Sequence, residues 1–188
     1  MEKTLSEMSL EELWMLFPII LTEHNDEWDY WYEIEERHLY SFLPKKIVKI
    51  SHIGSTAIKK IWAKPIIDIL VELSSNCVMV EIKEKLIANG YLCMSTEKER
   101  MSFNKGYTEN GFAEKVFHLH LRYAGDHDEL YFRDYMNDNP NLAKEYEKLK
   151  CSLWKKFEHN RDAYTQAKGT FTSQHTAEAK EKYIGRYL

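Results

Sequence analysis

Three residues of this sequence, Gly54, Ser55 and Asp68, have types and a spacing suited to binding a phosphate together with a metal ion. Gly54 and Ser55 follow an apolar run that predicts a β-strand over residues 47–53. A strand that passes through Gly-Ser into a short helix is a phosphate-binding arrangement, because the first N–H groups of the helix point at the anion. Glycine lets the phosphate approach the backbone closely, since it has no Cβ. The hydroxyls of Ser55 and Thr56 would add further donors.

Asp68 lies within the most strand-like segment of the chain, residues 66–73, which is an almost unbroken aliphatic run. Such a run is expected for a central strand that is buried on both faces. An ionised carboxylate in that environment is costly unless it is paired or binds a metal ion. A divalent cation, Mg²⁺ or Mn²⁺, that bridges Asp68 to a phosphate held at Gly54 and Ser55 would satisfy the charge.

Two histidines further along the chain are candidates to complete this site. His118 and His120 lie two residues apart in a strand expected over residues 116–123, so their side chains point to the same face. This spacing allows both imidazoles to bind one metal ion, or one to bind it while the other acts as a base. With Asp68 they would make a set of two histidines and one carboxylate. The alternative is that both are ordinary polar residues on a solvated sheet face.

Lys64, Arg133 and Lys168 are the basic residues that could neutralise phosphate charge. Lys64 immediately precedes the central strand, Arg133 could make a bidentate contact, and Lys168 stands in the C-terminal helical region. Each has a plainer alternative. Lys64 would be a surface lysine before a proline turn, and Arg133 would form an internal ion pair with Asp134.

The elements expected to position these residues alternate between strands and helices over the first two-thirds of the chain. We expect strands over residues 19–22, 47–53, 66–73, 91–94 and 116–123, and helices over residues 10–17, 26–42 and 78–89. Residues 96–111 are polar and are expected to include a mobile loop. The remainder is predicted to be helical, over residues 130–136, 140–157 and 161–183, with Gly169 as a weak point. The lysines of the helix over 140–157, including Lys150, are expected on its solvated face.

The composition restricts the class of protein. With 44% hydrophobic and 30% charged residues among its 188, the sequence is typical of a globular domain and not of a disordered chain. The net charge of −4 lacks the basic excess of a general nucleic-acid binder, so nucleic acid is not expected as a partner.

Three cysteines without a CxxC pair support neither a zinc ribbon nor a disulfide framework. No segment predicts a membrane span or a secretory signal, which favours a cytoplasmic location. The sequence does not indicate the oligomeric state.

Several motifs in chain order resemble the GrpB family, over about residues 28–171. They are His-Ile-Gly-Ser-Thr-Ala at 52–57, Ala-Lys-Pro-Ile-Ile-Asp-Ile at 63–69, Phe-His-Leu-His-Leu at 117–121, Phe-Arg-Asp-Tyr at 132–135, and residues 164–168. The Gly-Ser pair and Asp68 also resemble the looser pattern of the DNA polymerase β-like nucleotidyltransferase superfamily. That pattern places a second acid two residues after the first, where this sequence has Leu70, and Glu72 is one step too far along. A second departure is Lys59-Lys60, where similar family members usually have Pro-Gly.

The resemblance implies a nucleotidyltransferase-like α/β (α+β) fold in a single domain over residues 1–188. A mixed sheet flanked by helices would occupy about residues 19–125, and an all-helical extension about residues 128–188. The implied activity is metal-dependent nucleotidyl transfer from a nucleoside triphosphate to an unidentified acceptor. Catalytic and metal-binding roles would then belong to Asp68, His118 and His120. Phosphate-binding roles would belong to Gly54, Ser55, Thr56, Lys64, Arg133 and Lys168.

Two other functions stay open at this point. Leu70 in place of the second acid favours a non-catalytic module that binds a nucleotide or a coenzyme phosphate. GrpB-like domains also occur fused to dephospho-CoA kinase, which suggests nucleotide or coenzyme A chemistry by association. A metal-dependent hydrolase or oxygenase that uses Asp68, His118 and His120 is a third interpretation.

Overall fold

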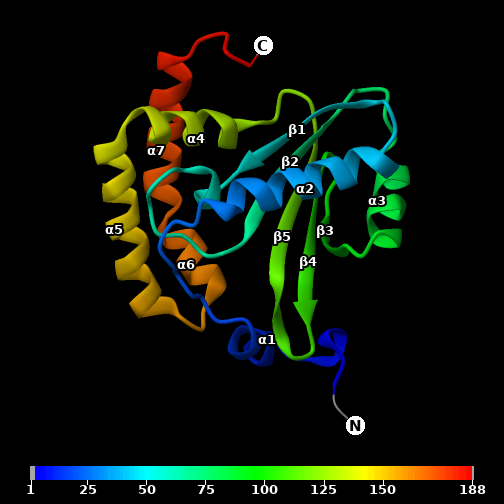
Figure 1. The fold of residues 1–188 in the computed structure, drawn as a ribbon, viewed down its shortest axis with the longest axis horizontal. Helices are drawn as coiled ribbons and strands as arrows, with labels where there is room; N and C mark the ends of the chain where they lie inside the picture. The colour runs from blue at the N-terminus through cyan, green and yellow to red at the C-terminus, as the bar shows by residue number, and fades with distance from the viewer. Residues whose placement is uncertain (1–2, 188) are drawn as a thin grey trace.

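A five-stranded mixed β-sheet organises the computed structural model, which describes residues 3–187 (Figure 1). The strands lie in the order β1 (Ile47–Ile53), β2 (Ile67–Leu73), β5 (Gly111–Tyr123), β4 (Arg100–Thr108) and β3 (Leu92–Thr96). Strands β2 and β5 pair in parallel, and the other three pairs are antiparallel. The predicted fold class is therefore confirmed.

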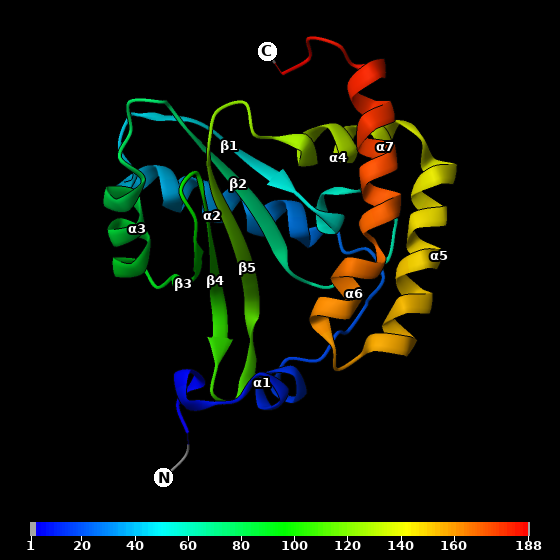
Figure 2. The same cartoon turned by 180° about the vertical axis from the view of Figure 1, so that it is seen from behind.

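Helices lie on both sides of this sheet (Figures 1 and 2). They are α1 (Leu10–Leu16), α2 (Glu27–Phe42), α3 (Met79–Ala88), α4 (Asp128–Asp138), α5 (Pro140–Phe157), α6 (Arg161–Ala167) and α7 (Gly169–Lys182), with two short 3₁₀ turns, η1 (Leu5–Glu7) and η2 (Ser55–Ala57). Helices α2 and α3 cover one face, while α4 to α7 gather beside β1 and β2 on the other. No helix within residues 3–187 is both long and apolar enough to cross a lipid bilayer.

The alternation of side chains along the central strands divides the sheet into an apolar and a polar face. Ile67, Ile69 and Val71 of β2 are fully buried in the main core, together with side chains from α2 and α3. Successive residues of a strand point to opposite faces, so Asp68 and Glu72 project to the other side. Leu70 lies between them on that side and is buried against Ile53 and Leu130, so this second face carries both polar and apolar residues.

Residues 96–111 are mostly β-strand, which was not expected, and only short turns at 97–99 and 109–110 separate β3, β4 and β5. Strand β4 covers Arg100–Thr108, and β5 begins at Gly111, five residues before the predicted start. Met101 and Phe103 point into the core, while Ser102 between them points to the opposite face, which is the alternation of a half-exposed strand. The strand register shifts at Gly106, whose φ is +88°, and this shift interrupts the alternation. The strand pattern is therefore hard to recognise in the sequence.

Several further expectations are corrected. Residues 19–22 form only an isolated bridge from Thr22 to Ala63. The helix expected after Gly54 is the three-residue turn η2, so no helix N-terminus faces a ligand there. The helix expected over 161–183 divides at Lys168 into α6 and α7. Lys150 is 1% exposed rather than solvated, because it donates to the Trp62 carbonyl.

Candidate functional site

Strand pairing brings the predicted acid and histidines together on the polar face of the sheet. Asp68 of β2 pairs with His118 of β5, and His118 pairs in turn with Asn104 of β4. Paired residues of neighbouring strands point to the same face. His120 follows two residues later on that face, while Leu119 between them is buried in the core.

The Asp68 carboxylate is flanked by both imidazoles. Its Oδ1 atom lies 3.3 Å from Nδ1 of His118 and 3.8 Å from Nε2 of His120. Burial alone would raise the pKa of Asp68, but the interactions with the two histidines outweigh it and hold the pKa well below its usual range. Burial lowers the pKa of His118, although Asp68 opposes that shift. The other ring nitrogen of His118 lies 2.8 Å from the Tyr107 hydroxyl.

Gly54 touches this carboxylate directly. A Cβ at position 54 would lie 2.3 Å from Oδ2 of Asp68, closer than any real contact. The backbone of Gly54 also has φ +71° and ψ −169°, a region that is essentially restricted to glycine. Glycine is therefore required here both for the turn and for the close approach of Asp68.

A cleft of about 540 Å³ opens in front of Gly54, Ser55 and Asp68. The helices α4, α5 and α7, with the α6–α7 junction, supply the rest of its lining, which comprises Asp128, Glu129, Phe132, Tyr146, Lys168, Thr172, Ser173, Thr176, Ala177 and Lys180. The end of β1, the start of β2 and the C-terminal helices thus enclose one site.

Lys168 is a cation of this cleft that has no carboxylate partner among the ion pairs of the described chain. Its ammonium lies 4.5 Å from the centre of the Tyr164 ring, and that of Lys64 lies 5.4 Å from the same ring. Burial lowers the pKa of Lys168 to about 8 and that of Lys64 to about 7, and repulsion from Lys168 adds to the shift of Lys64. Two crowded cations without acceptors favour the binding of an anion.

Three of the predicted phosphate ligands do not line this cleft. Thr56 is 1% exposed, and its hydroxyl donates to the carbonyl of Ile66. Arg133 pairs with Asp134 and donates to the carbonyl of His52, which ties α4 to β1. Lys64 instead lines a neighbouring cavity. The structure therefore gathers Gly54, Ser55, Asp68 and Lys168 at the cleft, with His118 and His120 behind Asp68.

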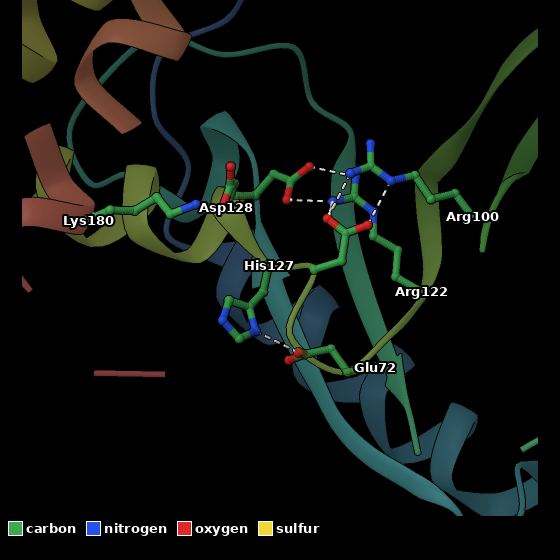
Figure 3. Close-up of polar contacts among 8 residues, drawn as sticks. Glu72, Arg100, Arg122, His127, Asp128 and Lys180 are labelled. Carbon is green, nitrogen blue, oxygen red and sulfur yellow. Dashed lines mark hydrogen bonds and ion pairs between the residues drawn. The ribbon is translucent and has the colours of Figure 1, made fainter. Parts of the chain in front are cut away.

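No second carboxylate stands beside Asp68 on its strand. Leu70 is fully buried, and the carboxylate of Glu72 lies 2.8 Å from Nδ1 of His127 (Figure 3). Within residues 3–187, no group of three or more His, Cys, Asp or Glu side chains is arranged to hold a metal ion.

The acids on the α4 wall of the cleft are already neutralised. Glu129 forms a bidentate pair with Arg122, with distances of 2.6 and 2.8 Å, and Asp128 lies 2.7 Å from Lys180 (Figure 3). Arg100 joins the same network through Asp126. The pair of Glu129 with Arg122 anchors the start of α4 to β5, and the pair of Asp128 with Lys180 ties it to α7. Lys168 and the histidine-flanked Asp68 are the other charged side chains of the cleft lining.

Sequence reasoning missed the α7 side of the site. Thr172, Thr176 and Lys180 lie four residues apart, so they share one face of the helix. This four-residue spacing is visible in the sequence and indicates a shared helix face. Tyr107 offered no comparable signal, because its segment was expected to be a loop.

Solved structures define the class of fold. The crystal structure of the conserved protein GrpB from Enterococcus faecalis superposes with a TM-score of 0.76 at 28% identity, covering 87% of this chain and 99% of that one. The Cid1 poly(U) polymerase with bound MgGTP superposes with a TM-score of 0.51 at 13% identity, over 71% of this chain and 44% of that one. This second likeness concerns the fold alone, and it makes the fold nucleotidyltransferase-like.

Sequence comparison gives the family. The profile described as GrpB protein matches residues 18–178. The glutamate-rich protein GrpB of Alkalihalophilus pseudofirmus is 34% identical over 161 residues, which cover 83% of this chain and 92% of that protein. The UPF0157 protein YqkA of Bacillus subtilis is 32% identical over 87% of this chain, and the match spans about half (48%) of YqkA. The chain belongs to the GrpB family, as the motifs predicted.

A kinase is also among the similar proteins. A dephospho-CoA kinase of Mycobacterium bovis is 28% identical over 148 residues, which cover 65% of this chain and 36% of that protein. Similarity thus extends over about a third of that kinase.

Proposed function

We propose that the chain binds the phosphate groups of a nucleotide, or of a nucleotide-containing coenzyme, in the cleft between the Gly54–Ser55 turn and Lys168. The observation that carries this proposal is the position of Lys168. It is a cation without a carboxylate partner among the described ion pairs, and it lines the same cleft as a glycine turn that carries the half-buried Ser55.

The size and polarity of the cleft support this choice of ligand. Ligand pockets typically measure about 300–1,000 Å³, and a cleft of 540 Å³ falls within that range. Phosphate oxygens would accept hydrogen bonds from the Ser55 hydroxyl and the Lys168 ammonium. The hydroxyls of Thr172 and Thr176 on α7 would be placed to contact the sugar.

Nucleotidyl transfer from a magnesium nucleotide is the second candidate, and the position of Asp68 favours it. The carboxylate stands against the Gly54 turn, on the strand that follows it, as the nucleotidyltransferase pattern requires. Magnesium supplied with the nucleotide would stabilise charge on the transferring phosphoryl group. With Leu70 buried and Glu72 bonded to His127, Asp68 would be its single carboxylate ligand from β2.

A thermal-shift panel with and without Mn²⁺ tests the binding proposal. The panel contains nucleoside triphosphates, nucleoside monophosphates and dephospho-coenzyme A. A ligand at one hundred times its Kd stabilises the folded state by about 2.7 kcal/mol, which corresponds to a rise in Tm of about 5–10 °C for a chain of this length. Lys168→Gln should remove most of this rise, whereas Lys155→Gln, at an exposed position of α5, should retain it.

Two results would separate the candidates. Stabilisation without release of pyrophosphate supports the binding module, and stabilisation that requires Mn²⁺ and is followed by pyrophosphate release supports transfer. If no nucleotide or coenzyme raises the Tm under either condition, both candidates are wrong.

A further inference from the structure

A second cavity, of about 370 Å³, lies beside the phosphate cleft on the same side of the sheet. It is enclosed by α1, by the β4–β5 hairpin and by the start of α6; Figure 2 shows α1 below the tip of this hairpin. Its walls are mainly apolar and include Leu13, Trp14, Phe17, Ile19 and Phe112. We refer to it as the α1 cavity.

Asn104 places an unpartnered donor in this apolar wall. Its side chain is 3% exposed, and its Nδ2 atom makes no hydrogen bond within the described chain. A buried polar group without a partner is costly, so such a group in a cavity wall indicates a bound acceptor. The acceptor that an amide N–H requires is a carbonyl or carboxylate oxygen.

Two cations line the α1 cavity near this amide. Arg161 and Lys64 both contribute to the lining, and neither has a carboxylate partner among the ion pairs of residues 3–187. Asp162 is the one acid of the lining, and its side chain is exposed to solvent. The lining therefore carries an excess of positive charge, which complements an anion.

We propose that the α1 cavity is a second ligand site, which binds a small carboxylate with an apolar body. The apolar body packs against Trp14 and Phe17. The charge pairs with Arg161, and a rotation of the Asn104 side chain, whose Nδ2 atom is buried from the cavity, lets the amide donate to one carboxylate oxygen. A guanidinium suits this role because its fork of N–H groups matches the geometry of a carboxylate.

The register of the sheet places this site next to the phosphate cleft. Asn104 pairs with His118, which pairs with Asp68, so two strand spacings, or about 10 Å, separate the two ends of this row. Tyr107 lines the α1 cavity and contacts His118, which in turn contacts Asp68. A carboxylate bound here would therefore lie beside a bound nucleotide, in the position of a second substrate. That last role rests on the proposed function, whereas the binding site itself does not.

Binding of two simple carboxylates tests the proposal. The probes are octanoate and 4-phenylbutyrate, and the matched neutral compounds are octan-1-ol and 4-phenylbutan-1-ol. Titration is followed in ¹H–¹⁵N spectra through the Trp14 indole N–H and the Asn104 side-chain amide, both of which line the cavity. We expect both signals to shift with the carboxylates, and the alcohols to bind at least about tenfold more weakly, because they lack the charge-assisted contact.

Two variants and a control complete the experiment. Arg161→Gln should weaken octanoate binding by at least about tenfold, and Asn104→Leu should do the same while removing the unpartnered amide. Lys155→Gln on α5 should bind octanoate as wild type does. The proposal is overturned if neither carboxylate shifts the two signals at millimolar concentration, if the alcohols bind as tightly, or if Arg161→Gln leaves the affinity unchanged. Nucleotide binding depends on Lys168, so failure of one site leaves the other standing.

Discussion

The carboxylate of Asp68 occupies the space that a side chain at Gly54 would need. Its Oδ2 atom lies 2.3 Å from the position of a Cβ on Gly54, in a turn whose backbone already has φ +71°. The two residues are fourteen positions apart in the sequence, and the antiparallel pairing of β1 with β2 brings them together. The Gly-Ser turn and the acid are therefore one structural unit.

Gly54→Ala should destabilise the protein strongly. The new methyl group would meet the Asp68 carboxylate in a backbone conformation that disfavours alanine, so we expect a loss of about 2–4 kcal/mol in the free energy of unfolding. Urea unfolding measures this loss. Gly169→Ala is the matched control, since nothing lies within 4 Å of the added Cβ and the φ is not positive. Equal stability of the two variants would contradict the close contact.

Asp68→Asn should lower the pKa of His118 further. Burial already lowers it, and the negative charge of Asp68 opposes that effect, so removing the charge should lower the pKa of His118 further. NMR titration of the imidazole measures the shift. An unchanged or higher pKa in the variant would show that the charge of Asp68 does not act on His118.

The acid stability of the protein should depend on the same carboxylate. The folded-state pKa of Asp68 lies below its value in the unfolded chain, about 3.9. Its contribution to stability is thus present above pH 4 and is lost as the pH falls through the folded-state pKa. Between pH 5 and pH 3, wild type should lose more unfolding free energy than Asp68→Asn. A parallel decline of the two proteins would exclude this contribution.

Lys60→Gly should stabilise the protein. Lys60 has φ +62°, and no other non-glycine residue of the described chain has a positive φ. Glycine adopts this conformation without the steric cost, at the expense of greater freedom in the unfolded chain, so we expect a gain of about 0.5–1 kcal/mol. Lys59→Gly should give no gain, because Lys59 has no positive φ. Chemical denaturation of both variants tests the difference.

Nucleotide affinity should decrease as the pH rises above about 8. Phosphate favours the charged form of Lys168, whose pKa burial lowers to about 8, so binding near that pH should take up a proton. Calorimetry in two buffers with different ionisation enthalpies measures this uptake, and Lys168→Gln should abolish it. Binding that takes up no proton at pH 8 would place the phosphate away from this lysine.

The sequence predicted the part of the site that local patterns encode. The Gly-Ser turn, the aliphatic strand around Asp68 and the spacing of His118 and His120 are all local features, and the register of β2 with β5 brings them together. Arg133 and Thr56 are residues of types that commonly bind phosphate. Their hydrogen bonds to backbone carbonyls on other elements depend on tertiary packing, which a local pattern does not specify.

The hairpin of β4 and β5 shows why the α1 cavity could not be predicted. Its strands are half polar and contain an irregular position at Gly106, so the segment has the composition of a loop. Asn104 and Tyr107 gain their positions only from pairing with β5. Lys150 is a similar case, since the Trp62 carbonyl and the Tyr146 ring, both brought to it by tertiary packing, account for a lysine inside the protein.

A crystal structure of the chain with a bound nucleotide tests the central claim most directly. The account predicts phosphate density in the cleft, with oxygens within hydrogen-bonding distance of the Ser55 hydroxyl and the Lys168 ammonium, and with Asp68 beside them. A nucleotide bound elsewhere, with Ser55 and Lys168 not in contact with phosphate, would contradict it.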